Sequence, residues 1–151
     1  MTPPDIPIHP DSTRFPHGAC AGCHDSAPLA FAFEYAYQPI VDLATRSIYA
    51  HEALVRGPRG ESAASVLAQV NDENRYRFDQ ACRVKAVAGA ARLGMQGYLS
   101  INFLPNAVYR PEVCIRSTLE AATRHSFPTD KIIFEVTEGE RVQDQIGRAH
   151  V

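Results

Sequence analysis

The sequence contains no tryptophan, only two methionines and only four cysteines among its 151 residues. It has no apolar stretch of the roughly 18 residues that a membrane-spanning helix needs, so we expect no membrane contact. The formal net charge of −2 excludes a strongly basic surface, and we therefore expect no binding of DNA or RNA. The N-terminus lacks the basic-then-apolar pattern of a secretory signal, which predicts a cytoplasmic protein.

The composition is that of a folded protein, because 45% of the residues are hydrophobic and 21% are charged. Residues 1–28 are rich in proline and have no hydrophobic periodicity, which predicts an irregular leader. Residues 29–145 carry the periodic patterns of secondary structure and form the folded part of the chain.

The expected elements follow one another in a regular order. Residues 31–43 and 48–56 read as two strands joined by a short turn, which predicts a hairpin. Beyond the hairpin we expect helices at 61–72 (with Ser62 as N-cap), 76–93 and 110–126, and strands at 97–105 and 131–138. The apolar stripe of the helix at 76–93 is expected at Phe78, Ala81, Val84, Ala88 and Ala91. Alternating helices and strands predict an α/β fold with parallel strands and helices packed outside.

Polar side chains interrupt three of these apolar strands. Glu52 and Arg56 lie in the second strand, Asn102 in the third and Glu135 in the fourth. In a parallel barrel the strand ends converge, so these oxygens would meet at one place. Carboxylate and amide oxygens suit Mg²⁺ or Mn²⁺, and a guanidinium suits a phosphate. The alternative is that each is an ordinary solvent-facing or paired side chain.

Four short motifs occur in a fixed order: YQPIVDL (37–43), EALVR (52–56), SINFLP (100–105) and FEVTE (134–138). Together they resemble the EAL domain family of cyclic di-GMP phosphodiesterases, over residues 33–144. The resemblance implies a TIM-like (β/α) barrel whose first strand runs antiparallel to the others. Because the family continues for about another hundred residues, we interpret 29–145 as the N-terminal part of an EAL domain, about half a barrel.

The resemblance also implies a reaction, the hydrolysis of cyclic di-GMP to pGpG with Mg²⁺ or Mn²⁺, two ions in the intact domain. Glu52, Asn102 and Glu135 match the metal-ligand positions of the family, and Gln38 and Arg56 match positions that contact the substrate. Glu138 matches a glutamate that steadies a loop near the dimer interface. Glu52, Glu135 and Glu138 are thus the expected catalytic residues, and the intact protein is expected to form a homodimer.

Further family motifs that complete the site are missing from this sequence, so we expect the chain by itself to be inactive. The alternative to an enzyme is a degenerate EAL domain that acts as a cyclic di-GMP receptor or protein-interaction module without turnover. The final hexapeptide IGRAHV (146–151) matches the translation of a common sequencing adapter, which predicts a non-native tail. A genuine helix start is the other interpretation.

The segment CAGCH (20–24) leaves several interpretations open. It fits the C-x-x-C-H pattern of haem attachment, which would require export. Cys20 and Cys23 could instead form a zinc half-site or a redox pair, or lie in a plain loop as free thiols. Cys82 and Cys114 fall within helical patterns, where we expect buried and unreactive thiols.

Overall fold

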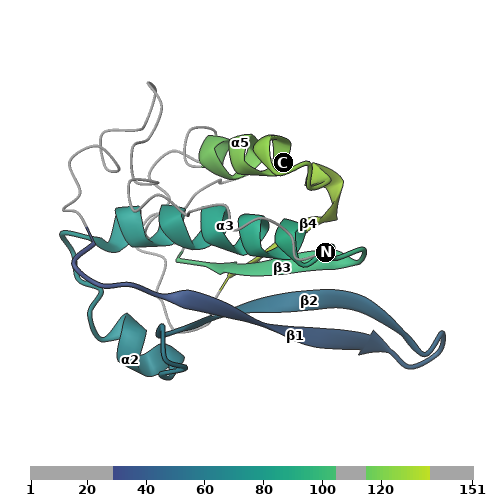
Figure 1. The fold of residues 1–151 in the computed structure, drawn as a ribbon, viewed down its shortest axis with the longest axis horizontal. Coiled ribbons are helices and arrows are strands. Elements are labelled where there is room, and N and C mark those ends of the chain that lie inside the picture. The colour runs from purple at the N-terminus through teal and green to yellow at the C-terminus, as the bar shows by residue number, and fades with distance from the viewer. Residues whose placement is uncertain (1–28, 105–114, 137–151) are drawn as a thin grey trace, which may run out of the picture.

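The computed structural model describes residues 29–104 and 115–136, and these form one mixed four-stranded sheet in the order β1-β2-β3-β4 (Figure 1). The first pair of strands is antiparallel and the following pairs are parallel. The strands are β1 (Glu34–Asp42), β2 (Ser47–Arg56), β3 (Tyr98–Phe103) and β4 (Ile132–Val136). The expected hairpin and the expected parallel strands are therefore both confirmed.

The helices lie mainly on one side of this sheet. They are α2 (Ala63–Leu67), α3 (Arg75–Arg92) and α5 (Arg116–Arg124), followed by a short 3-10 turn, η2 (Thr129–Lys131). Helices α3 and α5 contact each other above the sheet, whereas α2 lies beside β2 (Figure 1). Within the described ranges, no helix has both the length and the apolar character needed to cross a membrane.

A side-chain turn closes the β1–β2 hairpin. Asp42 Oδ1 accepts hydrogen bonds from the backbone N–H of Ala44 at 2.8 Å and of Thr45 at 3.4 Å. Hydrogen bonds from Thr45 and Ala44 hold the pKa of the Asp42 carboxyl below its usual value, because they favour the charged form. Arg46 then adopts φ 54°, in the left-handed region, and the chain enters β2. The short turn expected between the first two strands is thus stabilised by the Asp42 side chain, which accepts hydrogen bonds at the end of β1.

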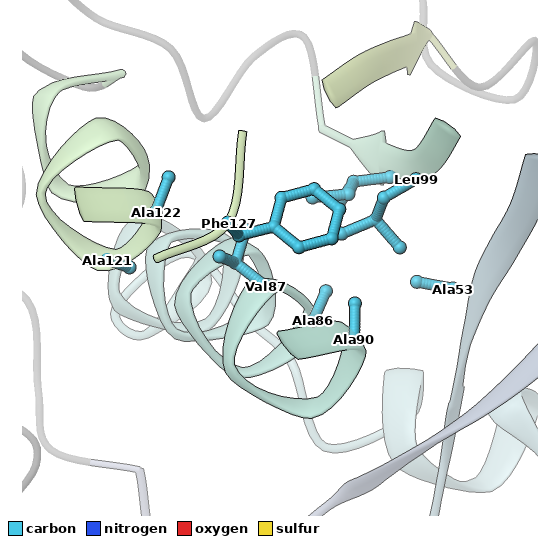
Figure 2. Packing of buried hydrophobic residues seen from close by; sticks show 9 residues of the cluster. Ala53, Ala86, Val87, Ala90, Leu99, Ala121, Ala122 and Phe127 are labelled. Carbon is cyan, nitrogen blue, oxygen red and sulfur yellow. The ribbon is translucent and has the colours of Figure 1, made fainter. Parts of the chain in front are cut away.

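The main core lies between the sheet and the two long helices. Small side chains on α3 and α5 let the helices approach, and larger ones from the sheet and from Phe127 fill the space (Figure 2). Its buried members are Ala53, Ala86, Val87, Ala90, Leu99, Ile101, Ala121, Ala122 and Phe127. A second cluster, of Phe33, Val66, Phe78 and Cys82, joins α2 to the first half of α3.

The buried face of α3 differs from the expected apolar stripe. Phe78 is buried as expected, but Ala81, Val84, Ala88 and Ala91 are only half-buried. The buried positions are Phe78, Asp79, Gln80, Cys82, Arg83, Ala86, Val87 and Ala90. Val84 and Ala91 still pack against the main core, and Ala81 packs against the second cluster. The most deeply buried stripe differs because it includes Asp79 and Arg83, whose opposite charges are paired inside the protein.

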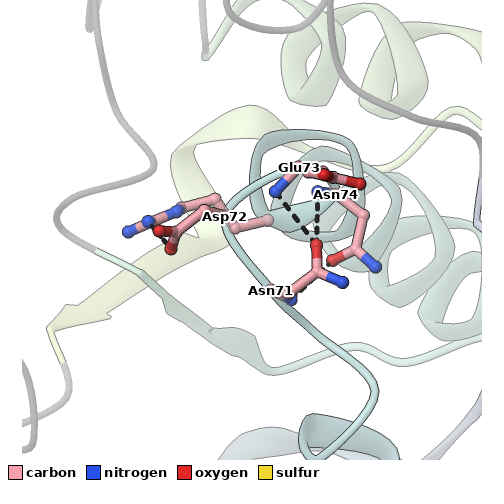
Figure 3. Close-up of polar contacts among 5 residues, drawn as sticks. Asn71, Asp72, Glu73 and Asn74 are labelled. Carbon is pink, nitrogen blue, oxygen red and sulfur yellow. Dashed lines mark hydrogen bonds and ion pairs between the residues drawn. The ribbon is translucent and has the colours of Figure 1, made fainter.

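The first expected helix was too long. Ser62 caps α2 as predicted, accepting a hydrogen bond from Ser65 N at 3.3 Å, but the helix ends at Leu67 instead of continuing to residue 72. Residues 68–74 form turns that lead into α3, which begins at Arg75 (Figure 3). Asn71 Oδ1 accepts the N–H of Asn74 at 3.2 Å, and Asn74 Oδ1 accepts the N–H of Asn71 at 2.9 Å. This reciprocal pair is equivalent to a capping box and diverts the chain from continuing as α2.

The C-terminus of α3 and the position of α5 agree with the sequence. Gly94 ends α3 with φ +65°, as its position predicts, and Met95 N donates to Ala90 O at 3.1 Å. The helix expected at 110–126 appears as α5, whose described part begins at Arg116. The expected positions 105–114, including Cys114, lie outside the described residues.

Cys82 is buried, as predicted. Burial raises the pKa of its thiol to about 12, since the thiolate would lose its hydration. A thiol that stays protonated is a poor nucleophile, so Cys82 packs as a small apolar side chain. The cysteines of the CAGCH segment, together with the leader at 1–28 and the tail at 146–151, lie outside the described residues, and the interpretations of them stay predictions.

Candidate active site

The alternation of side chains along β2 and β3 separates the core from the candidate site. Ala53, Leu99 and Ile101 point toward α3 and belong to the core. Their neighbours in sequence, Glu52 and Asn102, therefore point to the opposite face of the sheet. The charged and amide groups thus sit on the face that α3 and α5 do not cover.

Two hydrogen bonds join three strands on this face. Asn102 Nδ2 donates to Glu52 Oε1 at 2.9 Å, linking β3 to β2. Ser100 Oγ donates to Glu135 Oε1, linking β3 to β4. The bonds run diagonally, because the strand register pairs Glu52 with Ser100 and Asn102 with Glu135. Asn102 thus lies between Glu52, to which it is hydrogen-bonded, and Glu135, its register partner in β4, so the three residues that the sequence predicts to meet occupy neighbouring positions on one face of the sheet.

The chemistry of this group fits a divalent cation. Glu52 and Glu135 supply carboxylate oxygens and Asn102 supplies an amide oxygen, and hard cations prefer such ligands. Each carboxylate already receives one hydrogen bond from β3, which helps to fix its orientation. No group of three His, Cys, Asp or Glu side chains with metal-binding geometry occurs among residues 29–104 and 115–136. A cation here would depend on the amide of Asn102.

The two expected substrate-contacting residues flank this group. Gln38 is the register partner of Glu52 across the β1–β2 hairpin, so both side chains lie on the same face. Arg56 is four residues after Glu52 in β2 and shares that face by alternation. Its Nη1 donates to the carbonyl oxygen of Val55 at 2.8 Å. Glu138, the remaining expected site residue, lies outside the described residues.

Ser100 is a site residue that the sequence analysis did not identify. Its side chain is fully buried, and its hydroxyl donates to Glu135. The signal was available in the motif SINF, because residues two apart in a strand share a face and Asn102 was already assigned to the site. The serine was overlooked because a hydroxyl group in a strand is not by itself a signal of a functional site.

A hollow among the described residues does not coincide with this group. It is about 480 Å³ in volume and is lined by residues that include Tyr37, His51, Leu93 and Met95. Tyr37 reaches α3 through its hydroxyl, and His51 is the register partner of core residue Leu99, so the hollow is on the helix-covered face. None of the predicted site residues lines it.

A family model decides the membership of the chain. The model described as "EAL domain" matches residues 27–148. The chain belongs to the EAL domain family. The expected fold is confirmed as well, because the mixed sheet with its antiparallel first strand matches part of the barrel in solved EAL structures.

Solved and curated EAL proteins include similar relatives. A standalone versatile EAL protein from Vibrio cholerae, in a form with cyclic di-GMP bound, is 61% identical with a TM-score of 0.73, over 78% of this chain and 49% of that one. A manganese and cyclic di-GMP complex of BlrP1 from Klebsiella pneumoniae is 31% identical with a TM-score of 0.64, over 70% and 27%. The curated antirepressor BluF of Escherichia coli, regulated by blue light and temperature, is 31% identical over 70% of this chain and 27% of its own.

The chain therefore spans about half the length of the Vibrio protein and about a quarter of BlrP1 and BluF. The structures of the relatives contain cyclic di-GMP, in one case together with manganese. These ligands belong to those proteins.

Proposed function

We propose that this chain is part of a phosphodiesterase that hydrolyses cyclic di-GMP to the linear dinucleotide pGpG with the help of Mg²⁺ or Mn²⁺. The observation that carries the proposal is the placement of Glu52, Asn102 and Glu135 at neighbouring positions on one face of three adjacent strands. Hydrolysis of a phosphodiester needs a site that stabilises negative charge and activates water, and a bound divalent cation supplies both.

Each residue of the candidate site would have its own role in this reaction. Glu52, Asn102 and Glu135 would hold the cation through their oxygens, and Ser100 would orient the Glu135 carboxylate through its hydroxyl. Arg56 would bind a phosphate oxygen of the dinucleotide, because a guanidinium offers paired donors to phosphate. Gln38 would contact the substrate from the neighbouring strand β1. Glu138 remains a proposed catalytic residue that steadies a loop at the site.

The decisive experiment measures turnover with and without one carboxylate. Because the chain spans about half of the Vibrio protein, the assay uses the full-length protein that contains this chain, with residues 1–151 alone as a second sample expected to be inactive. We expect Mn²⁺-dependent release of pGpG from the full-length protein, and a loss of at least about 100-fold in kcat for Glu52→Ala. Asp130→Ala is the matched control, since this exposed carboxylate lies in η2, just before β4 begins. Equal kcat values for wild type and Glu52→Ala would contradict the assignment.

A receptor without turnover is the second candidate, and one relative favours it. BluF, which is 31% identical, is described as an antirepressor, a regulator that acts on another protein. The same experiment separates the two candidates. Binding of cyclic di-GMP in calorimetry without release of pGpG, under any divalent cation, would support the receptor and contradict the enzyme.

We further propose that the intact protein is a homodimer, as its family resemblance suggests, and that it is cytoplasmic. Light scattering of the full-length protein at micromolar concentration would test the dimer, for which twice the monomer mass is expected. A monomeric mass with full phosphodiesterase activity would contradict a requirement for dimerisation.

A further inference from the structure

A buried ion pair lies directly behind the candidate site, on the helix-covered side of the sheet. Asp79 and Arg83 are one turn apart on α3, and each is only 2% exposed. Asp79 Oδ2 accepts from Arg83 Nη1, and Asp79 Oδ1 accepts from the backbone N–H of Leu104 at 3.0 Å. Arg83 Nε in turn donates to Thr118 Oγ1 of α5 at 3.0 Å.

These contacts end at two points that matter for the site. Leu104 comes two residues after Asn102, just beyond the last register pair of β3 with β4 at Phe103. The Asp79 carboxylate thus takes the N–H of Leu104 at the point where the strand ladder ends. Thr118 belongs to α5, the helix that leads through η2 into β4 and so to Glu135. The pair therefore ties the exit of one ligand-bearing strand to the helix that precedes the next.

Packing alone does not account for these two charges. Burying an ion pair costs hydration on both sides, and apolar residues of similar volume often stabilise a protein as well or better. Elsewhere on the same face of α3 the positions are filled by Ala86, Val87 and Ala90. The charged pair adds a defined orientation. A carboxylate whose two oxygens both accept hydrogen bonds is held in place, and it therefore holds in place the backbone N–H that donates to it.

We propose that Asp79 is a positioning residue, which holds the end of β3 through Leu104 and so sets the side chain of Asn102 against Glu52. Arg83 holds Asp79 in that orientation. This inference rests on the proposed function, because it gives the pair a role in the phosphodiesterase site. A displacement of about 1 Å in a reacting or ligating group can cost about 100-fold in rate. Loss of the anchor should therefore lower kcat more than it raises KM.

The test uses a variant that removes both charges together, Asp79→Leu with Arg83→Met, in the full-length protein. No unpaired charge is left in the interior, so we expect a urea midpoint close to that of wild type. We expect the Leu104 amide to exchange with deuterium at least about 10-fold faster, since its acceptor is gone. We also expect kcat for cyclic di-GMP to fall by about 10- to 100-fold and the affinity for Mn²⁺ to weaken.

Asp79→Asn is a second variant that keeps the shape of the side chain. Arg83 and Leu104 donate to different oxygens of Asp79, and in asparagine one of these two positions is an NH2 group, which donates and cannot accept. We expect the same faster exchange at Leu104 and a smaller loss of kcat. Val87→Ala is the matched control, because it removes buried volume from the same helix face without contacting Leu104. It should lower the urea midpoint and leave kcat unchanged.

Two results would overturn the inference, and a third would overturn the proposed function instead. The first is wild-type kcat and wild-type Leu104 exchange in the double variant. The second is an equal fall of kcat in Val87→Ala, which would mean that general stability controls activity. The third result is that the full-length wild-type protein neither binds nor hydrolyses cyclic di-GMP. The proposed function then fails, and the positioning role is decided by Leu104 exchange and by the NMR signal of the Asn102 side-chain amide, which must both change in the double variant.

Discussion

The two faces of the sheet use opposite chemistry at adjacent positions of the same strands. On the helix-covered face, Leu99 and Ile101 are completely or almost completely buried against small side chains of α3 and α5. On the other face, Ser100 and Asn102 donate hydrogen bonds to carboxylates of neighbouring strands. One face stabilises the fold by removing apolar area from water, and the other presents two carboxylates, each hydrogen-bonded to the strand between them.

This difference shows how a short strand can serve stability and function at the same time. Successive side chains of a strand point to opposite faces. A change at an odd-numbered residue of SINF (100–103) therefore acts mainly on packing, and a change at an even-numbered residue acts on the polar group. The buried pair of Asp79 and Arg83 is the exception, since it places charge within the packed face. Its contact with Leu104 connects the packed face to the end of the strand that carries Asn102.

The largest expected effect comes from breaking the packed face. Leu99→Ala removes a completely buried side chain from the core and should lower the free energy of unfolding by about 2–5 kcal/mol. Ser100→Ala, at the next position, removes one hydroxyl and should cost about 1 kcal/mol. Urea unfolding followed by circular dichroism measures both. A cost for Ser100→Ala as large as that for Leu99→Ala would contradict the division between the faces.

A smaller effect tests how β1 is held against α3. Tyr37 Oη donates to the carbonyl oxygen of Ala86 at 2.8 Å, and a Cβ at Gly89 would lie 2.1 Å from that hydroxyl. Gly89→Ala should therefore cost about 1–3 kcal/mol in unfolding free energy through overpacking. Tyr37→Phe removes the clashing oxygen, so the double variant should be more stable than Gly89→Ala alone. If the second substitution gives no recovery, the clash is not the cause.

The smallest expected effect is a pH dependence of the same contact. Burial raises the pKa of Tyr37 to about 12, because the phenolate would lose hydration. The unfolded chain releases this proton near its ordinary pKa of 10.0, so ionisation favours the unfolded state above that pH. The contribution of Tyr37 is complete below pH 10 and is lost as the pH rises toward 12. Urea midpoints between pH 8 and pH 11.5 should thus decline less steeply for Tyr37→Phe, and parallel curves would contradict this.

The sequence by itself determined the order and direction of the strands, and it named most residues of the candidate site. Alternation in β2 and β3 and the motifs around Glu52, Asn102 and Glu135 are local signals, readable from neighbouring residues. The turn at Asp42 and the cap at Ser62 are also local features. In each, a side chain accepts a hydrogen bond from a backbone N–H two or three residues later.

Only the tertiary structure decided which charges are buried and what they hold. Asp79 and Arg83 look like solvent-facing residues in the sequence, because their partners Leu104 and Thr118 are 25 and 35 residues away. The same holds for Ser100, whose role depends on Glu135 in the next strand. Hydrogen bonds between distant residues leave no periodic pattern along the chain. The buried face of α3 and the crossed bonds of the site therefore become visible only once the strands and helices are packed together.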